Sequence, residues 1–540
     1  MTEMCKPGWL GVTCNASRVV ALDLENSGLD GQIPPCITNL TLLSRIHFPG
    51  NLLSGHILAQ LGQLSRLSYL NLSSNSLTGS IPNTLSSTSL QVIDLGNNKL
   101  SGDIPESLGM LRNLSVLRLA RNSLTGRIPL SLGSSTSNSL VSVILANNSL
   151  TGPIPSALAD SSSLQVLNLV RNNLDGEIPP ALFNSTSLQR LALGWNNFSG
   201  SIPAVVPNFN SPLQALILSV NSLAGTIPST LGNFSSLRIL LLAANSFKGS
   251  IPLEAGDWSF LSSLANCTQL QVLSLGTNMM QGNLPSSVGK LATSLRALVL
   301  HANKMSGSVP AEIGNLTNLS FLRMEQNLFA GDLPEAIGNL ANLTSVDLSR
   351  NRLSGQIPRS IGKLRQLTKL FLQDNNLSGP IPRELGDCQS LITLNLSCNA
   401  LSESIPRELF FLDSLSSEYG IGNKISTAGD VYSYGIIILE MLTGKRPTDV
   451  LFKNGLSLQK FVGNAFPEKI REILDPNIIG DEVADHGNHA MVGMLSCIMQ
   501  LVQIGLSCSK EIPRDRPTMP DVYAEVSTIK REYSALRVKQ

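Results

Sequence analysis

The chain of 540 residues is poor in charged and aromatic side chains and carries no excess of either charge. Charged residues make up 14% of it and aromatic residues 4%, while 39 Lys and Arg balance 38 Asp and Glu, for a net charge of +1. A globular chain usually has about 25% charged residues, and proteins that bind nucleic acid or a membrane surface usually carry a basic excess. The composition therefore gives no electrostatic case for a nucleic-acid or membrane-surface partner.

Two targeting signals are missing from the sequence. The first residues, MTEMCKPG, do not form a basic segment followed by an apolar run, as a secretory signal would. The longest apolar run, Tyr434–Leu442 (YGIIILEML), is far shorter than the roughly 20 residues of a membrane span and contains Glu440. We therefore expect neither a signal nor a membrane anchor in the sequence as given, which leaves its location open.

A leucine pattern fills most of the chain. The motif L-x-x-L-x-L-x-x-N recurs every 23–26 residues with one longer interval, as in Leu67–Asn75 (LSYLNLSSN) and Leu237–Asn245 (LRILLLAAN). A period in this range is the signature of leucine-rich repeats, which bury their cores only by stacking on one another. The last position of the motif falls in 16 repeats at Ser27, Asn51, Asn75, Asn98, Asn122, Asn148, Asn172, Asn196, Asn221, Asn245, Asn278, Asn303, Asn327, Asn351, Asn375 and Asn399.

Each position of the repeat has a physical role. The leucines of L-x-L point inward from a short strand, and the residues between and beside them point outward onto the concave face. The Asn follows the strand, where its amide can satisfy backbone groups that would otherwise be buried without partners. The next segment, L-x-G-x-I-P as in Leu77–Pro82 (LTGSIP), has a Gly that permits a bend and a Pro that suits a sheet edge.

One repeat is longer than the others. The interval from Asn245 to Asn278 holds 33 residues, with an insertion around Glu254–Phe260 (EAGDWSF). Insertions in a solenoid form loops on one face. This loop is either functional or a tolerated surface loop, and the sequence leaves both open.

The composition changes near residue 416. Charged residues rise from about 12% of residues 1–415 to about 23% of residues 416–540, and the leucine period stops. Three stretches of this second segment resemble the end of a protein-kinase activation segment and the helices that follow it. They are Glu418–Gly435 (EYGIGNKISTAGDVYSYG), Leu439–Thr448 (LEMLTGKRPT) and Pro513–Val522 (PRDRPTMPDV).

Together, the L-x-G-x-I-P repeats and these stretches resemble a plant leucine-rich-repeat receptor-like serine/threonine kinase, of the long-ectodomain subfamily that acts in immune recognition and defence signalling. The resemblance implies an α/β solenoid of leucine-rich repeats, a right-handed superhelix of the plant-specific type, followed by a small all-α fragment of a protein-kinase C-lobe. It implies an N-terminal repeat cap at residues 1–18, the solenoid at 19–415 and the partial C-lobe at 416–540.

Only structural kinase residues carry over from this resemblance. Glu418 matches the Glu of the Ala-Pro-Glu motif, Arg516 its partner near the C-terminus, and Asp430 the helix residue that braces the catalytic loop. An active kinase also needs a Gly-rich loop, a Lys in V-A-I-K, and the motifs H-R-D and D-F-G, and none of these occurs in the sequence. We therefore expect no catalytic residue and no ATP or magnesium cofactor in this chain, although the intact family uses both.

The cysteines point to an oxidising compartment. The stretch Cys5–Cys14 (CKPGWLGVTC) resembles the cap of plant-type repeats, which implies a Cys5–Cys14 disulfide; two free thiols in a frayed terminus are the alternative. Cysteines at repeat positions are expected to behave as small buried hydrophobic residues, namely Cys36, Cys267, Cys388 and Cys398. The cysteines show no metal-ligand spacing with histidine, so we expect no metal site.

Glycosylation motifs agree with an extracellular first segment. All 14 N-x-S/T sequons lie before residue 416, although the repeat consensus generates some of them by itself. The candidate N-glycosylation sites are Asn15, Asn39, Asn71, Asn113, Asn147, Asn184, Asn197, Asn233, Asn266, Asn315, Asn318, Asn342, Asn376 and Asn395.

The resemblance also implies a ligand. Receptors of this family bind extracellular peptides or proteins across the concave or lateral face, in some cases with a co-receptor kinase. Exposed apolar residues beside arginines are typical interface anchors; the alternative is that these positions merely vary, or are covered by glycan. The outward candidates form an apolar group and a more polar group: Arg171, Trp195, Ile217, Val220 and Leu241, then Phe321, Arg323, Glu325, Lys369, Phe371 and Asp374.

Three functions stay open at this point. The favoured one is ligand binding without catalysis. The second is an active membrane receptor kinase of which this sequence is an incomplete account, lacking the C-terminal repeat cap, the membrane span and the N-lobe between Leu415 and Glu418. The third is a soluble decoy or scaffold.

Overall fold

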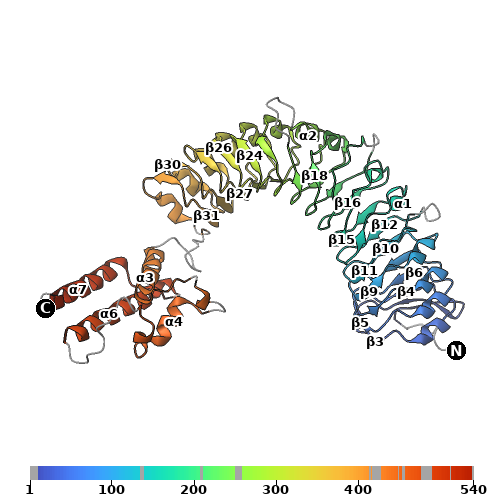
Figure 1. Cartoon of the computed structure of the whole chain (residues 1–540), viewed down its shortest axis with the longest axis horizontal. Helices are drawn as coiled ribbons and strands as arrows, with labels where there is room; N and C mark the ends of the chain where they lie inside the picture. Colours follow the sequence, from blue (N-terminus) through green and yellow to red (C-terminus); the bar gives the residue numbers. More distant parts are fainter. Residues whose placement is uncertain are drawn as a thin grey trace. The chain divides into compact units, whose positions relative to one another are not determined.

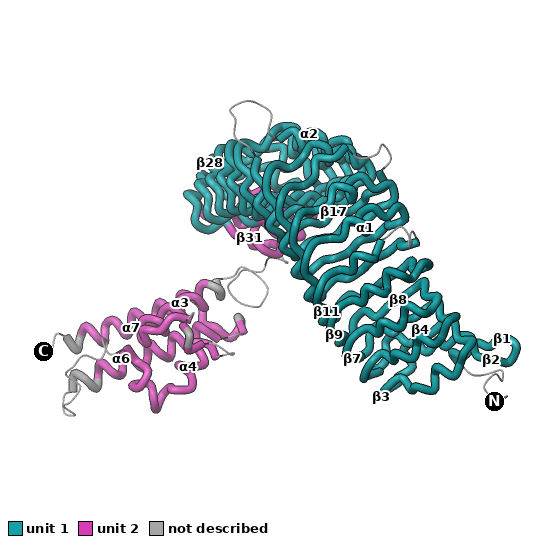
Figure 2. Tube along the Cα trace, turned by 45° about the vertical axis from the view of Figure 1, so that its right-hand side comes forward, with its two compact units in different colours: residues 1–364, 371–381, 396–403 teal, residues 365–370, 382–395, 404–540 magenta. Residues whose placement is uncertain are grey.

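The computed structural model describes residues 10–133, 139–206, 211–249, 258–412, 415, 427–447, 449–452, 456–475, 489–510 and 512–537. The chain divides into two compact units (Figure 2): unit 1 comprises residues 1–364, 371–381 and 396–403, and unit 2 comprises residues 365–370, 382–395 and 404–540. Unit 1 contains most of the repeats. The domain boundaries at residues 18 and 415 stay predictions.

The L-x-L segments form one long sheet, in which the described residues contribute 17 strands (Figure 1). From β2 to β27, each strand pairs in parallel and in register with the strand of the next repeat, and β1 pairs antiparallel to β2. The strands are β1 (Val12–Asn15), β2 (Arg18–Asp23), β4 (Arg45–His47), β6 (Tyr69–Asn71), β8 (Val92–Asp94), β10 (Val116–Arg118), β12 (Ser142–Ile144), β14 (Val166–Asn168), β16 (Arg190–Ala192), β17 (Ala215–Ile217), β19 (Ile239–Leu241), β21 (Val272–Ser274), β23 (Ala297–Val299), β25 (Phe321–Arg323), β27 (Ser345–Asp347), β29 (Lys369–Phe371) and β31 (Thr393–Asn395).

The repeat asparagines form a hydrogen-bonded ladder. In Asn75, for example, Oδ1 accepts the Leu53 N–H of the preceding repeat, and Nδ2 donates to the carbonyls of Phe48 and Leu72. The same three bonds recur from Asn51 to Asn399. This confirms that the Asn amide satisfies buried backbone groups, and it ties each repeat to the one before it.

A second row of strands follows the asparagines, which the sequence did not predict. These strands form small parallel sheets beside the main sheet. They are β3 (Asp30–Gln32), β5 (Leu52–Ser54), β7 (Thr78–Gly79), β9 (Lys99–Asp103), β11 (Ser123–Thr125), β13 (Thr151–Gly152), β15 (Asn173–Leu174), β18 (Ala224–Gly225), β20 (Ser246–Phe247), β22 (Gln281–Asn283), β24 (Lys304–Gly307), β26 (Leu328–Asp332), β28 (Arg352–Ser354), β30 (Ser378–Pro380) and β32 (Ala400–Ser402).

Short helices return the chain to the next strand. In most repeats the Pro of the I-P pair is the N-cap of a 3₁₀ helix, where its fixed φ and missing N–H cost nothing. In unit 1 and the last repeats they are η1 (Pro35–Asn39), η2 (Ala59–Gln63), η3 (Asn83–Ser87), η4 (Glu106–Met110), α1 (Ser156–Ala159), η5 (Pro180–Phe183), η6 (Ser229–Asn233), α2 (Ser259–Ser263), η7 (Leu264–Asn266), η8 (Ser286–Lys290), η9 (Ala311–Asn315), η10 (Glu335–Asn339), η11 (Arg359–Lys363), η12 (Arg383–Asp387) and η13 (Arg407–Phe411). The predicted insertion falls mostly outside the described residues; its end forms α2.

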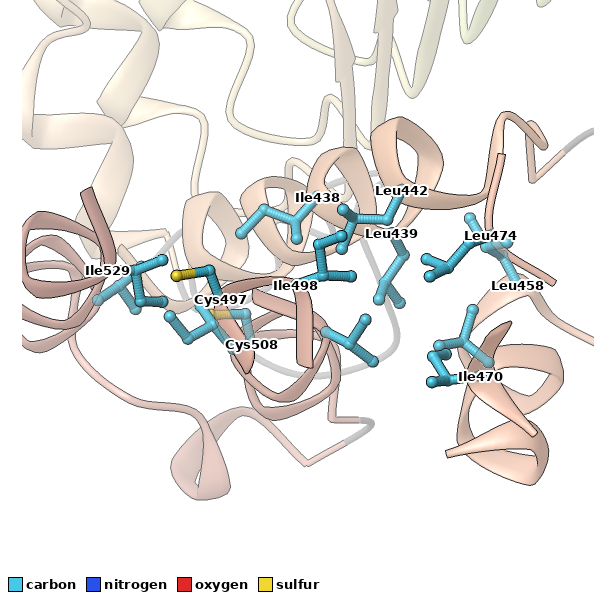
Figure 3. Close-up of a cluster of buried hydrophobic side chains, with 14 of the residues drawn as sticks. Ile438, Leu439, Leu442, Leu458, Ile470, Leu474, Cys497, Ile498, Cys508 and Ile529 are labelled. Atoms are coloured by element: carbon cyan, nitrogen blue, oxygen red, sulfur yellow. The ribbon is translucent and has the colours of Figure 1, made fainter. Parts of the chain in front are cut away.

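The described residues beyond residue 415 are helical. Helices α3 (Thr427–Thr443) and α6 (His489–Cys508) cross closely at two glycines, since a Cβ on Gly435 would lie 2.8 Å from the Gly505 carbonyl oxygen. The helices enclose an apolar core that includes Leu439, Ile498 and Cys508 (Figure 3). The remaining helices are η14 (Val450–Phe452), α4 (Leu458–Ala465), η15 (Ile470–Glu472), η16 (Pro513–Asp515) and α7 (Met519–Arg537).

The observed architecture confirms the predicted fold class, a leucine-rich-repeat solenoid followed by a small helical fragment. No helix within the described residues has both the length and the apolar character needed to cross a membrane.

Candidate ligand-binding surface

One column of candidate residues lies in the turns beyond the strands rather than within them. Arg171, Trp195, Val220 and Asp374 each precede a repeat Asn, and their φ angles lie between +55° and +60°. Neighbouring repeats hold this conformation, because the Trp195 N–H donates to the Ser219 carbonyl at 2.8 Å. The column therefore lies at the carboxyl edge of the sheet, and its place on the ligand-binding face stays a prediction.

The turn backbone at Val220 is strained. A φ of +60° is unfavourable for a β-branched residue, whereas Asn tolerates this region and occupies the same column at Asn97 (φ +55°). We expect Val220→Asn to raise the free energy of unfolding by about 1 kcal/mol, because relief of strain outweighs the loss of a half-buried side chain. Urea unfolding measures the change. The reverse substitution, Asn97→Val, is the matched control and should lower it by a similar amount; equal stability in both variants would refute the strain.

Trp195 and Arg171 meet on the surface. Trp195 is 45% exposed, and the Arg171 guanidinium carbon lies 5.3 Å from the centre of its ring, within the range of a cation–π contact. A shallow hollow of about 370 Å³ adjoins them, lined also by Val220 and by amide side chains: Asn148, Asn172, Asn173, Asn196 and Asn197. The sequence predicted this grouping of Arg171, Trp195 and Val220, and the structure brings the three together.

The apolar candidates of the strands also lie next to one another. Ile217 in β17 is paired in register with Leu241 in β19, and both side chains are partly exposed. Strands in a sheet lie about 4.8 Å apart, so the two side chains form a continuous apolar step on the outward face.

The residues of the second candidate group differ in how far their side chains are exposed. Phe321 in β25 is 50% exposed, and Arg323 forms an ion pair with Glu325. Glu325 itself is only 7% exposed, so its expected place among exposed residues was wrong. Glu325 stands two residues after β25, where Arg323 pairs with its carboxylate.

The other members of this group lie further along the solenoid. Asp374 is exposed and its carboxylate lies 3.6 Å from Arg350 Nε. Phe371 is partly buried in β29, and Lys369 is exposed and belongs to unit 2.

Three polar residues near Glu325 escaped the sequence analysis. His301, Asp347 and Gln373 occupy outward positions in neighbouring repeats, and Asp347 Oδ1 accepts from the Ser349 hydroxyl at 2.7 Å. The signal was present in the repeat register, because His301, Glu325 and Gln373 all stand two residues before a repeat Asn.

The structural kinase residues are only partly described. Asp430 lies exposed in the first turn of α3. The Arg516 Nε donates to the Lys510 carbonyl at 2.7 Å, and its guanidinium lies 4.7 Å from the centre of the Tyr432 ring. Glu418 lies outside the described residues, so its pairing with Arg516 stays a prediction.

The cysteines divide into bonded, buried and exposed groups. Cys14 is disulfide-bonded, and its expected partner Cys5 lies outside the described residues. Cys267 and Cys388 are buried as expected, and burial raises the pKa of the Cys267 thiol to about 12. Cys36 and Cys398 are exposed, so the expectation that they are buried was wrong. Cys36 lies in η1 of the first repeats, and Cys398 lies in the turn before Asn399, in the same column as Trp195.

Most sequons lie on the surface. Asn71 is the exception, since it is 9% exposed on β6 and its Oδ1 accepts the Ser73 N–H at 2.9 Å. Asn147, Asn342 and Asn395 are partly buried. The exposed sequon residues are Asn15, Asn39, Asn113, Asn184, Asn197, Asn233, Asn266, Asn315, Asn318 and Asn376. Across the described ranges, no group of three or more His, Cys, Asp or Glu is placed to hold a metal ion.

Comparison with known proteins gives the family of the chain. The family model "Leucine-rich repeat region" matches residues 294–417, and the model "Leucine Rich Repeat" matches residues 66–88, 89–111, 113–135 and 163–185. The rice (Oryza sativa subsp. japonica) receptor kinase-like protein Xa21 is 40% identical over 122 residues, which are 22% of this chain and 12% of Xa21. The matches span only 9–12% of the lengths of such curated relatives.

Solved receptor structures match much more of the chain. The ectodomain of the Arabidopsis thaliana membrane receptor kinase GASSHO1/SCHENGEN3, in complex with CASPARIAN STRIP INTEGRITY FACTOR 2, is 35% identical with a TM-score of 0.62 over 76% of this chain and 57% of that one. The plant peptide hormone receptor RGFR1, in complex with RGF2, is 32% identical with a TM-score of 0.55 over 76% of this chain and 82% of that one. The chain therefore belongs to the plant leucine-rich-repeat receptor kinase family.

Proposed function

We propose that the repeats of this chain bind an extracellular peptide or protein, that a co-receptor kinase joins the complex, and that the chain itself does not transfer phosphate. The observation that carries the proposal is the group formed by Trp195, Arg171 and the apolar step of Ile217 and Leu241. Trp195, Ile217 and Leu241 are partly or largely exposed, although their size and apolar character favour burial.

Their arrangement supports a binding role. A half-exposed Trp beside an Arg has the composition of an interface hot spot, in which few residues supply most of the affinity. Neighbouring repeats fix the turn that carries Trp195, since its N–H donates to the Ser219 carbonyl, so the ring loses little freedom when a ligand binds. Two similar solved structures, of GASSHO1/SCHENGEN3 and of the peptide hormone receptor RGFR1, are in complex with CASPARIAN STRIP INTEGRITY FACTOR 2 and RGF2, which favours a peptide ligand here.

The lack of catalysis is proposed from the sequence. A kinase holds Mg²⁺ and ATP with the motifs V-A-I-K, H-R-D and D-F-G, and none of them occurs in the 540 residues. Incubation of the full chain with labelled ATP, Mg²⁺ and a general kinase substrate should transfer no label above the level of a buffer control. Labelled substrate would overturn this part of the proposal.

The binding role is tested at Trp195. Peptides selected on the immobilised full chain from a random displayed library should bind wild type, and Trp195→Ala should weaken their binding by about 10- to 100-fold. The loss is expected because Trp195 offers a large apolar ring that is already exposed and needs little reorganisation. Calorimetry or surface plasmon resonance measures the affinity.

Leu130→Ala is the matched control for this test. Leu130 is 73% exposed, but it lies between β11 and β12, outside the strands of the main sheet. Its substitution should leave the affinity unchanged. If both variants bind as wild type does, the surface around Trp195 is not the binding site. A library that yields no peptide overturns the proposed binding function.

A further inference from the structure

A row of polar side chains crosses the outward face near the end of unit 1. His301, Glu325 and Gln373 stand at the same position of their repeats, two residues after the strand of each, with the small Ser349 in the repeat between. Hydrogen bonds between repeats fix the row, because the N–H groups of Ala302 and Arg350 donate to the carbonyls of Glu325 and Gln373, both at 2.9 Å. We call His301, Glu325 and Gln373 the polar row.

Each member of the polar row has a buried atom without a hydrogen-bond partner among the described residues. The atoms are His301 Nδ1, Glu325 Oε2 and Gln373 Oε1. Glu325 is more than nine-tenths buried, with 7% of its surface exposed. A buried polar group without a partner destabilises a fold, and so it calls for an explanation. Here three such groups lie in one row on the face that the repeats present outward, which points to a ligand that supplies the missing partners.

The charges around the row select the kind of ligand. Arg323 pairs with Glu325 through Oε1, and Asp347 adds a second carboxylate, so the two acids exceed the one base by a single negative charge. Burial lowers the pKa of His301; Glu325 and Asp347 oppose this shift and Arg323 adds to it. His301 is therefore neutral at neutral pH, and Glu325 and Gln373 offer acceptor oxygens. The row needs a donor group with positive charge.

We propose that the polar row binds a cationic nitrogen group of the ligand, namely a Lys or Arg side chain or a free amino terminus. The inference rests on the proposed ligand-binding function and deepens it. Ammonium and guanidinium groups carry only donors, three and five respectively, and so they fit acceptors such as Glu325 Oε2 and Gln373 Oε1. Arg323 is half exposed and pairs with Glu325 through Oε1, so Oε2 is the oxygen that the ligand cation takes.

The geometry suits an extended peptide. Neighbouring repeats lie about 4.8 Å apart, so His301 and Glu325 are one step apart and Gln373 lies two steps further on. One cationic group reaches His301 and Glu325 together, and a residue further along the peptide reaches Gln373. Phe321, half exposed in β25, offers an apolar surface for the aliphatic part of a basic side chain.

The experiment uses peptides selected from a random displayed library on the full chain, and compares wild type with Glu325→Gln. This substitution keeps the shape of the side chain and removes its charge. We expect the selected peptides to contain a required basic group and to bind the variant about 10- to 100-fold more weakly. Glu312→Gln is the matched control, since Glu312 is exposed in η9 of a neighbouring repeat, and it should bind as wild type does.

Chemical variants of the peptides identify the source of the cation. Citrulline replaces Arg, norleucine replaces Lys and acetylation blocks the amino terminus. The change that removes the bound cation should weaken binding to wild type by a similar factor and should have little further effect on Glu325→Gln. If Glu325→Gln fails to fold, as judged by circular dichroism, Gln373→Met serves as the second variant and should weaken the same peptides severalfold.

The outcomes are distinct. Peptides that bind tightly but lose nothing in Glu325→Gln, or in Gln373→Met where that variant is needed, overturn this inference and leave the proposed function standing. Peptides that bind wild type equally well after every positive charge has been removed also overturn this inference and leave the proposed function standing. A library that yields no binder to wild type overturns the proposed function, and this inference with it.

Discussion

Replacing Asn327 by alanine is expected to lower the free energy of unfolding of unit 1 by about 3–5 kcal/mol. Asn327 is 5% exposed and makes four hydrogen bonds to backbone groups. Its Oδ1 accepts the Met305 N–H at 3.1 Å, and its Nδ2 donates to the carbonyls of Leu300, Met324 and Glu325 at 3.1–3.3 Å. Alanine removes the acceptor of the buried Met305 N–H and one of the donors to each of the three carbonyls, which keep only their bonds from Asn303, Asn351 and Ala302.

The measurement is amide hydrogen exchange of the full chain with urea unfolding beside it, because a solenoid can open locally before it unfolds as a whole. Asn318→Ala is the matched control. Asn318 also donates to a backbone carbonyl, that of Thr293 at 2.8 Å, but it is exposed, and its loss should cost less than about 0.5 kcal/mol. Equal losses in the two variants would show that the ladder contributes no more than an exposed contact does.

The repeat register was enough to predict the ladder and the solenoid. Asn75, for instance, recurs at a fixed distance after the leucines, and a period of this length leaves stacking as the only way to bury the core. The sequence also predicted that Trp195 and Arg171 are neighbours, because residues at the same position of successive repeats lie one strand apart. Periodicity thus gives contacts between repeats without any further information.

Backbone conformation and burial within a column could not be predicted in the same way. Nothing in the identity of Val220 suggests a φ of +60°, since the hydrogen bonds of the flanking repeats impose it. The burial of Glu325 also depends on its neighbours, because only the packing of adjacent side chains decides whether an outward position meets solvent. The residue pattern predicts the register of the repeats, but it does not predict backbone angles or side-chain burial, which depend on the neighbouring repeats.

The second large effect is expected at Phe198, where alanine should lower the stability of its repeat by about 3–5 kcal/mol. Phe198 is fully buried and takes the place that Leu has in most L-x-G segments; its N–H donates to Asn221 Oδ1 at 3.0 Å. Alanine keeps this hydrogen bond but leaves a cavity in the stacked core. Leucine fills most of the space, so Phe198→Leu should cost less than about 1.5 kcal/mol.

The site of the loss is as informative as its size. Because each repeat contacts only its neighbours, the cavity should weaken the repeats around Phe198 and spare distant ones. Exchange of the Trp195 amide, bonded to the Ser219 carbonyl, should therefore quicken, while exchange of the Leu348 amide, bonded to the Phe371 carbonyl, should not. Phe411→Ala is the exposed control, at 73% exposure, and should change neither rate. If both amides quicken together in Phe198→Ala, the repeats unfold as one cooperative unit, and the hollow beside Trp195 draws its rigidity from the whole solenoid rather than from its own repeats.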